Sequence, residues 1–212
     1  MDYSPALHDF KKNFAAGKSQ ILWQWIPADL ETPVSAFLKL AGHAPYSFLL
    51  ESVEGGATLG RYSAIGLNPD LVWKTNKETK NPLQSLRAHL NESKIDIVDE
   101  TLPPMAASGL FGYLGYDCVR WVENIPDNNP DELNIEDSIM MRPTQMVLFD
   151  NVQNMMCLST PVRDHANNFD GSADDAYALA QKRLDDLYSK LNQSVDGSFL
   201  HSQTKIVDIP KA

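Results

Sequence analysis

The stretch YSFLLESVEGGATLGRYSAIG, residues 46–66, decides the fold of this 212-residue chain. Residues 46–52 and residues 61–66 each have the length and the apolar density of a β-strand, and the connection between them contains Gly55 and Gly56. Two such runs joined through glycines are typical of an antiparallel hairpin or meander. We therefore expect an antiparallel sheet to be built around this stretch.

Further strands and helices are predicted on both sides of this hairpin. Apolar runs of strand length occupy residues 21–26, 71–75, 95–98, 145–150 and 155–160, and the last two read as a second hairpin. Capping residues ahead of apolar repeats predict helices that start near Thr32, Asn81 and Ser172. The Asn81 helix carries Leu83, Leu86 and Leu90 on one face, and the Ser172 helix carries Tyr177, Ala180, Leu184, Leu187 and Leu191. This pattern predicts an α+β fold, a mainly antiparallel β-sheet or sandwich with flanking helices.

Glycines recur at intervals of three in GLFGYLGYDCVR, residues 109–120, at Gly109, Gly112 and Gly115. The series lacks the lysine of a phosphate-binding P-loop and does not fit the dinucleotide pattern GxGxxG. Glycine also allows another backbone to approach closely, because it has no Cβ atom. We therefore predict that these glycines serve packing and not phosphate binding.

Composition narrows the classes of partner. The chain has 18 Lys and Arg against 28 Asp and Glu, a formal charge of −10, which repels nucleic-acid phosphates and anionic membrane surfaces. Its two cysteines, Cys118 and Cys157, have neither disulfide-framework nor zinc-site spacing. The first residues lack an apolar signal core, and no run approaches the roughly 20 apolar residues of a membrane span. We expect a cytoplasmic protein with no nucleic-acid or membrane partner.

No catalytic set can be assembled from the sequence. The five histidines are scattered, and none forms a recognisable catalytic pair with a serine, a cysteine or an acidic cluster in the sequence. The acidic residues of 127–137 lack the order of an EF-hand loop. We expect no catalytic residue, no metal site and no cofactor in this chain.

Four segments carry a family resemblance. LLES at 49–52, RYSAIG at 61–66, GLFGYLGYDCVR at 109–120 and MVLFD at 146–150, followed by a helix, resemble the N-terminal region of anthranilate synthase component I in order and approximate spacing. The resemblance implies a lyase of tryptophan biosynthesis that makes anthranilate from chorismate and glutamine-derived ammonia, with feedback inhibition by L-tryptophan. It implies a glutamine amidotransferase subunit, component II, as a partner.

The resemblance also divides the chain. Residues 1–195 are expected to be the tryptophan-sensing domain, and residues 196–212 a linker toward a C-terminal catalytic domain that this chain does not contain. That domain would bind chorismate and Mg²⁺, so the chain alone is expected to be inactive. Two alternatives stay open: the equivalent domain of aminodeoxychorismate synthase component I, in the folate pathway, and a stand-alone binding or interaction domain.

The LLES segment is half of the tryptophan site in that family. We expect Glu51 to accept the ligand ammonium or to organise the pocket, Ser52 to pack its hydroxyl closely against ligand or backbone, and Arg61 to donate to the ligand carboxylate or to face the indole. Leu50 and Tyr62 would line the indole slot. Glu51 and Ser52 are both accessible only if the strand ends or twists there, because neighbouring side chains point to opposite faces. The alternative is a hairpin salt bridge between Glu51 and Arg61, with Ser52 bonded to its own backbone.

Overall fold

The fold is given by a computed structural model, which describes residues 2–53, 59–96, 99–106, 109–126, 128, 130–163 and 171–196. The side chains of Ser52, Val53 and Leu59 lie outside this description, and so do residues 197–212, most of the expected linker. The expected strand at 95–98 is not formed at residues 95 and 96, and residues 97 and 98 fall outside the described part.

The larger of two antiparallel sheets has five strands. Their order is β1 (Gln20–Pro27), β8 (Met155–Val162), β7 (Gln145–Asp150), β3 (Leu59–Leu67) and β2 (Phe48–Val53). The pairs β2–β3 and β7–β8 are the two hairpins predicted from the sequence. With helices packed outside antiparallel strands, the α+β class is confirmed.

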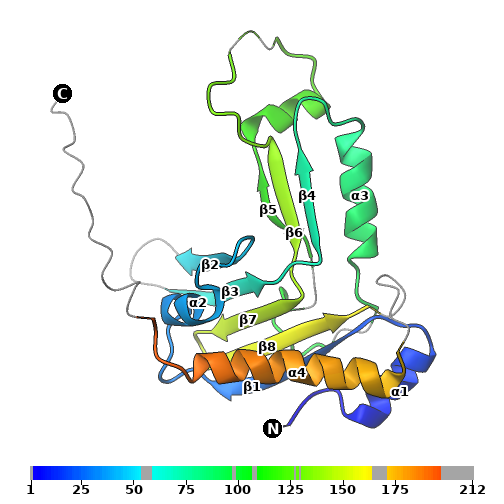
Figure 1. Cartoon of the computed structure of the whole chain (residues 1–212), viewed down its shortest axis with the longest axis vertical. Helices are drawn as coiled ribbons and strands as arrows, with labels where there is room; N and C mark the ends of the chain where they lie inside the picture. The colour runs from blue at the N-terminus through cyan, green and yellow to red at the C-terminus, as the bar shows by residue number, and fades with distance from the viewer. Residues whose placement is uncertain are drawn as a thin grey trace, which may run out of the picture.

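The smaller sheet has three strands in the order β4 (Leu71–Thr75), β6 (Ser138–Arg142) and β5 (Phe111–Leu114). Figure 1 shows it rising from the larger sheet as an upright arm, with α3 (Pro82–Glu92) beside it. The predicted apolar face of α3 has no buried residue in the described structure, and Leu90 is 44% exposed. A hydrogen bond links α3 to the smaller sheet: the indole N–H of Trp73 in β4 donates to Ser85 Oγ of α3 over 3.0 Å.

Three helices cover one face of the larger sheet, with α4 (Ala173–Leu191) in front of β8 in Figure 1, whereas the 3₁₀ helix η1 (Tyr116–Trp121) lies at the far end of the arm. Helices α1 (Leu7–Ala15) and α2 (Pro33–Ala41) contact α4, and all three contribute to one hydrophobic core. Ser172 and Asp175 form the predicted capping box of α4, and its whole predicted apolar stripe is buried. The apolar stripe predicted for α4 therefore forms part of the core between the helices and the larger sheet.

Both connections between the two sheets lie at one corner. Residues 68–70 join β3 to β4, and Pro143 and Thr144 join β6 to β7. The backbone N–H of Thr144 donates to Leu67 O over 3.2 Å, and that of Asp70 donates to Arg142 O over 3.1 Å. Hydrogen bonds between the two connections thus fix the base of the arm.

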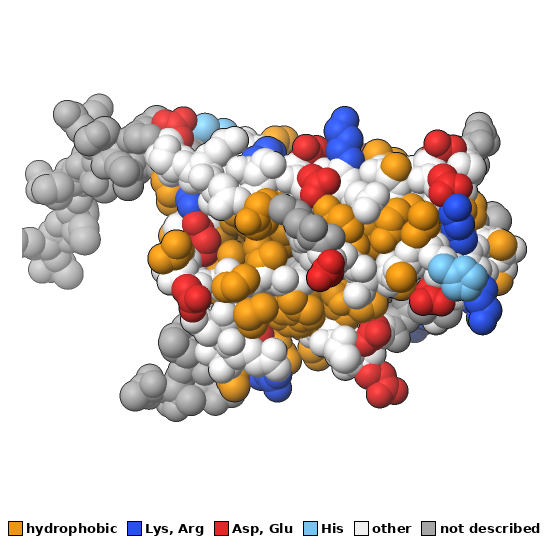
Figure 2. Space-filling model, turned by 90° about the horizontal axis from the view of Figure 1, so that it is seen from below, with side chains coloured by type: hydrophobic (Ala, Val, Ile, Leu, Met, Phe, Trp, Pro, Cys, Tyr) orange, Lys and Arg blue, Asp and Glu red, His pale blue; other side chains and the backbone are white. Residues whose placement is uncertain are grey.

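Hydrophobic side chains gather on the lower face of the molecule. Figure 2 shows them over the middle of this face, with acidic and basic side chains mostly around them and some acidic side chains among them. Among the described residues, no helix is both long enough and apolar enough to cross a membrane. The charge of −10 therefore does not cover this face evenly.

Candidate functional site

The predicted site residues of the LLES segment lie on β2, the edge strand of the larger sheet. Leu50 pairs with Ala64 and Glu51 with Ser63, so Leu50 and Glu51 face opposite sides of the sheet. Both are exposed, Leu50 by 48%. The pairing register shifts between Glu51 and Val53, which is the irregularity that the predicted site requires at this point.

Arg61 is bound to the carboxylate that ends β7. Its Nε donates to Asp150 Oδ2 over 3.2 Å and its Nη2 to the same oxygen over 2.9 Å. The guanidinium carbon also lies 4.8 Å from the centre of the Tyr62 ring, within cation–π range. The salt bridge of Arg61 is therefore made to Asp150 and not, among the described residues, to Glu51.

Asp150 is a nearly buried carboxylate, with a side chain that is 2% exposed. Burial alone would raise its pKa, but hydrogen bonds from Arg61 and from the backbone N–H groups of Gln153 and Val152 outweigh burial and lower the pKa below its ordinary value. The same carboxylate thus closes the β7–β8 turn and orients Arg61.

Acid stability is expected to depend on Asp150. Because its pKa is lower in the folded than in the unfolded state, its stabilisation is present above the unfolded pKa and is lost as the pH falls through the folded pKa. Urea unfolding between about pH 4 and pH 2 should show a smaller slope of unfolding free energy against pH for Asp150→Asn than for wild type. Arg61→Gln, which keeps the carboxylate and its backbone donors, should reduce the slope less. An unchanged slope in Asp150→Asn would contradict this role.

Arg61 and Tyr62 line an open groove of about 580 Å³. The groove is also lined by Trp25, Glu100, Thr101, Leu102, Pro104, Gln153 and Met155. The described residues Leu50 and Glu51 do not line it. The structure therefore brings Arg61 and Tyr62 together, places Leu50 and Glu51 on the adjacent edge strand, and leaves the Ser52 side chain undescribed.

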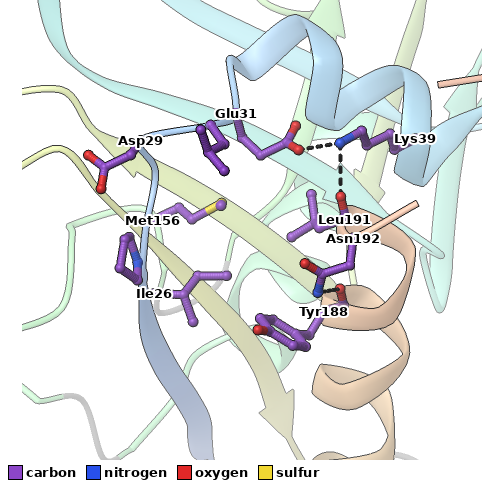
Figure 3. Close-up of a pocket in the computed structure, with 10 residues that line it drawn as sticks. Ile26, Asp29, Glu31, Lys39, Met156, Tyr188, Leu191 and Asn192 are labelled. Carbon is purple, nitrogen blue, oxygen red and sulfur yellow. Dashed lines mark hydrogen bonds and ion pairs between the residues drawn. The ribbon is translucent and has the colours of Figure 1, made fainter. Parts of the chain in front are cut away.

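A second pocket, of about 400 Å³, lies between the connection from β1 to α2 and the end of α4, and sequence reasoning missed it (Figure 3). Its lining is Ile26, Pro27, Asp29, Leu30, Glu31, Lys39, Met156, Tyr188, Leu191 and Asn192. Lys39 Nζ pairs with the Glu31 carboxylate and donates to Leu191 O over 2.9 Å. No sequence signal marks this arrangement, because Lys39 and Leu191 are 152 residues apart.

A salt bridge and a hydrogen bond in the wall of this second pocket link α2 to α4. Glu31 and Lys39 are each only 12% exposed, and Glu31 also accepts a hydrogen bond of 2.8 Å from Ser35 Oγ. A cation at the last turn of a helix is favourable, because the terminal carbonyl groups there have no partner within the helix. Lys39 therefore joins α2 to the carboxyl end of α4.

Comparison with known proteins finds clear relatives, although no family model matches the sequence. Anthranilate synthase component 1 of Cereibacter sphaeroides is 39% identical, over 89% of this chain and 40% of that protein. The Thermus thermophilus protein of the same name is 40% identical over 65% of this chain and 31% of its own length. The Pseudomonas aeruginosa protein is 37% identical over 79% and 36%.

A solved structure agrees at the level of the fold. The crystal structure of anthranilate synthase component I from Streptococcus pneumoniae TIGR4 superposes with a TM-score of 0.54 at 18% sequence identity. It covers 81% of this chain and 37% of that one. The chain spans about two fifths of the length of the relatives it matches. Over that shared part, the chain belongs to the anthranilate synthase component 1 family.

Proposed function

We propose that this chain is the tryptophan-sensing part of an anthranilate synthase component I. The observation that carries the proposal is the 39% identity to a protein of that name over 89% of the chain. The complete protein would make anthranilate from chorismate, with ammonia supplied by a glutamine amidotransferase subunit. The chorismate pocket and its Mg²⁺ belong, in this proposal, to a catalytic domain outside this chain.

The geometry at the edge of the larger sheet supports half of an amino-acid site. A zwitterionic ligand needs acceptors for its ammonium, donors for its carboxylate and an apolar slot for its side chain. Glu51 is an exposed carboxylate, Leu50 an exposed apolar side chain, and the Arg61 side chain is 50% exposed although it is bound to Asp150. Because Asp150 neutralises Arg61, the guanidinium suits an aromatic face or a single hydrogen bond better than a full ion pair.

Inhibition follows from a difference in binding between two states. Tryptophan held at the ends of β2 and β3 would bridge this domain to the catalytic domain and favour an arrangement in which chorismate and ammonia react poorly. An open half-site binds weakly by itself, since the other contacts are missing. Calorimetry with this chain is expected to give tryptophan affinity far below that of the complete protein, and equal affinity would refute the division of the site.

Substitution at Ser52 tests the assignment in the complete component I that carries this chain. Ser52→Phe is expected to raise the tryptophan concentration for half-inhibition at least tenfold with little change in kcat, because the ring fills the proposed slot. Ser189→Phe, on the exposed surface of α4, is the matched control and should leave inhibition unchanged. Unchanged inhibition in Ser52→Phe would refute the proposal.

A further inference from the structure

Three arginines lie near the carboxylate of Asp70 at the corner that joins the two sheets. Arg142 Nε donates to Asp70 Oδ1 over 2.6 Å, and Arg163 Nη1 lies 3.8 Å from Asp70 Oδ2. Arg183 of α4 is close enough for Asp70 to raise its pKa, although burial lowers that pKa more. These four side chains, here called the corner cluster, come from the β3–β4 connection, β6, the end of β8 and α4.

The corner cluster carries more positive than negative charge. The guanidinium groups of Arg142 and Arg163, which stay protonated in proteins, contact a single described carboxylate, and that of Arg183 lies within electrostatic range of it, in a chain whose formal charge is −10. The side chains of Arg142 and Arg163 are only 8% and 3% exposed, so water compensates little of this charge. Burial, with a smaller contribution from Arg142, lowers the pKa of Arg163 to about 10, although Asp70 opposes the shift.

Several donors of the corner cluster have no acceptor. Arg142 Nη1, Arg163 Nε and Arg163 Nη2 are buried and have no hydrogen-bond partner within the described structure. A buried donor of a charged group without a partner is costly, and native structures rarely keep one. On Arg163 the two free nitrogens form the edge of the guanidinium that binds two oxygens of one anion side by side.

We propose that the corner cluster binds a small inorganic oxyanion of the phosphate or sulfate type. Among the described residues the cluster carries three positive charges and one negative charge, and a dianion would balance them; its oxygens can accept from the unpaired nitrogens of both Arg142 and Arg163. Such an ion would join the arm to the larger sheet and to α4. The proposal does not depend on the tryptophan site. That site is proposed on β2 and β3, and β2 pairs with one edge of β3 while β7, which follows the corner, pairs with the other.

Phosphate and sulfate are the probes, with sodium chloride at equal ionic strength as the reference. At tenfold excess over its Kd, phosphate is expected to raise the Tm by on the order of 3 °C beyond chloride. Arg163→Met should abolish this difference, while Arg87→Met, which removes an exposed charge on α3, should keep it. Equal Tm values in phosphate, sulfate and chloride, or a full phosphate response in Arg163→Met, would overturn the site.

A measurement on the unmodified chain tests the site without any substitution. The ³¹P resonance of inorganic phosphate should broaden in the presence of the native chain and should sharpen again when excess sulfate competes. Urea-unfolded chain should cause no broadening, because the cluster exists only in the folded state. Absence of broadening with native chain, or broadening that sulfate does not reverse, would contradict the proposal.

Discussion

Gly112→Ala is expected to lower the free energy of unfolding by about 3 kcal/mol, because overpacking and backbone strain act together. A Cβ atom at Gly112 would lie 1.8 Å from Ile139 O and 3.0 Å from Met140 Cα on the neighbouring strand β6. These are backbone atoms, so the clash cannot be relieved by rotating a side chain. Either β6 shifts or the four-residue strand β5 separates from it.

Urea unfolding followed by circular dichroism measures the loss, and hydrogen exchange at residues 111–114 shows whether β5 has separated. Gly109→Ala is the matched control, because among the described residues its new Cβ would meet ring atoms of Phe111 at 3.6 and 3.8 Å, an ordinary contact. Equal unfolding free energies for the two variants would show that the close approach at Gly112 has no energetic weight.

Lys39→Met is expected to cost on the order of 3 kcal/mol, the range for removing one partner of a buried ion pair. The substitution leaves the Glu31 carboxylate 12% exposed without its cation, and it removes the donor to Leu191 O at the end of α4. The cost therefore reflects an unpaired buried charge more than the net strength of the pair. Thermal and urea unfolding at neutral pH measure it.

A double-mutant cycle with Glu31→Gln separates the two causes. If the buried charge dominates, the pair of substitutions together should be less destabilising than Lys39→Met alone. Lys11→Met is the control, because its ion pair with Asp174 is 43% and 63% exposed and should contribute less than about 1 kcal/mol. Additive effects of Glu31→Gln and Lys39→Met would contradict the coupling.

Local chemistry made part of the fold predictable. The Ser172 capping box and the apolar stripe of α4 were readable, because a cap and a 3.6-residue period are properties of neighbouring residues. The packing interpretation of the glycine series is confirmed at Gly112 and at Gly115, where a Cβ would lie 2.7 Å from Asp137 O. At Gly109 an added Cβ would make only ordinary contacts with described residues, so the regular spacing of the three glycines does not mean that all three allow a close backbone approach.

The elements that escaped prediction depend on distant partners. Helix α1 carries Leu7, Phe10 and Phe14 at helical spacing, but it buries only Phe10, so its apolar stripe is much shorter than the one that identifies α4. Strand β6 pairs with β4 on one side and with β5 on the other. Three of the four residues of β5 are exposed and β6 buries only its two end residues, which weakens the alternation expected of a half-buried strand.

In the candidate site, too, the features set by neighbouring residues were predictable and those that depend on distant residues were not. Tetrapeptides placed Leu50, Glu51 and Arg61 on neighbouring strands, and the observed β2–β3 pairing agrees with that placement. The partner of Arg61 was not predictable, because Asp150 lies 89 residues further along the chain. Whether these residues hold tryptophan stays a prediction.

The corner between the sheets has a mechanical consequence. The smaller sheet is joined to the larger one by two short strips of backbone that run side by side and are cross-linked by hydrogen bonds between Leu67 and Thr144 and between Asp70 and Arg142. Two connections linked by hydrogen bonds restrict rotation of the smaller sheet more than one connection would. We therefore expect the smaller sheet to move as a rigid body, so that a displacement of its far end changes the geometry of the corner cluster at its base.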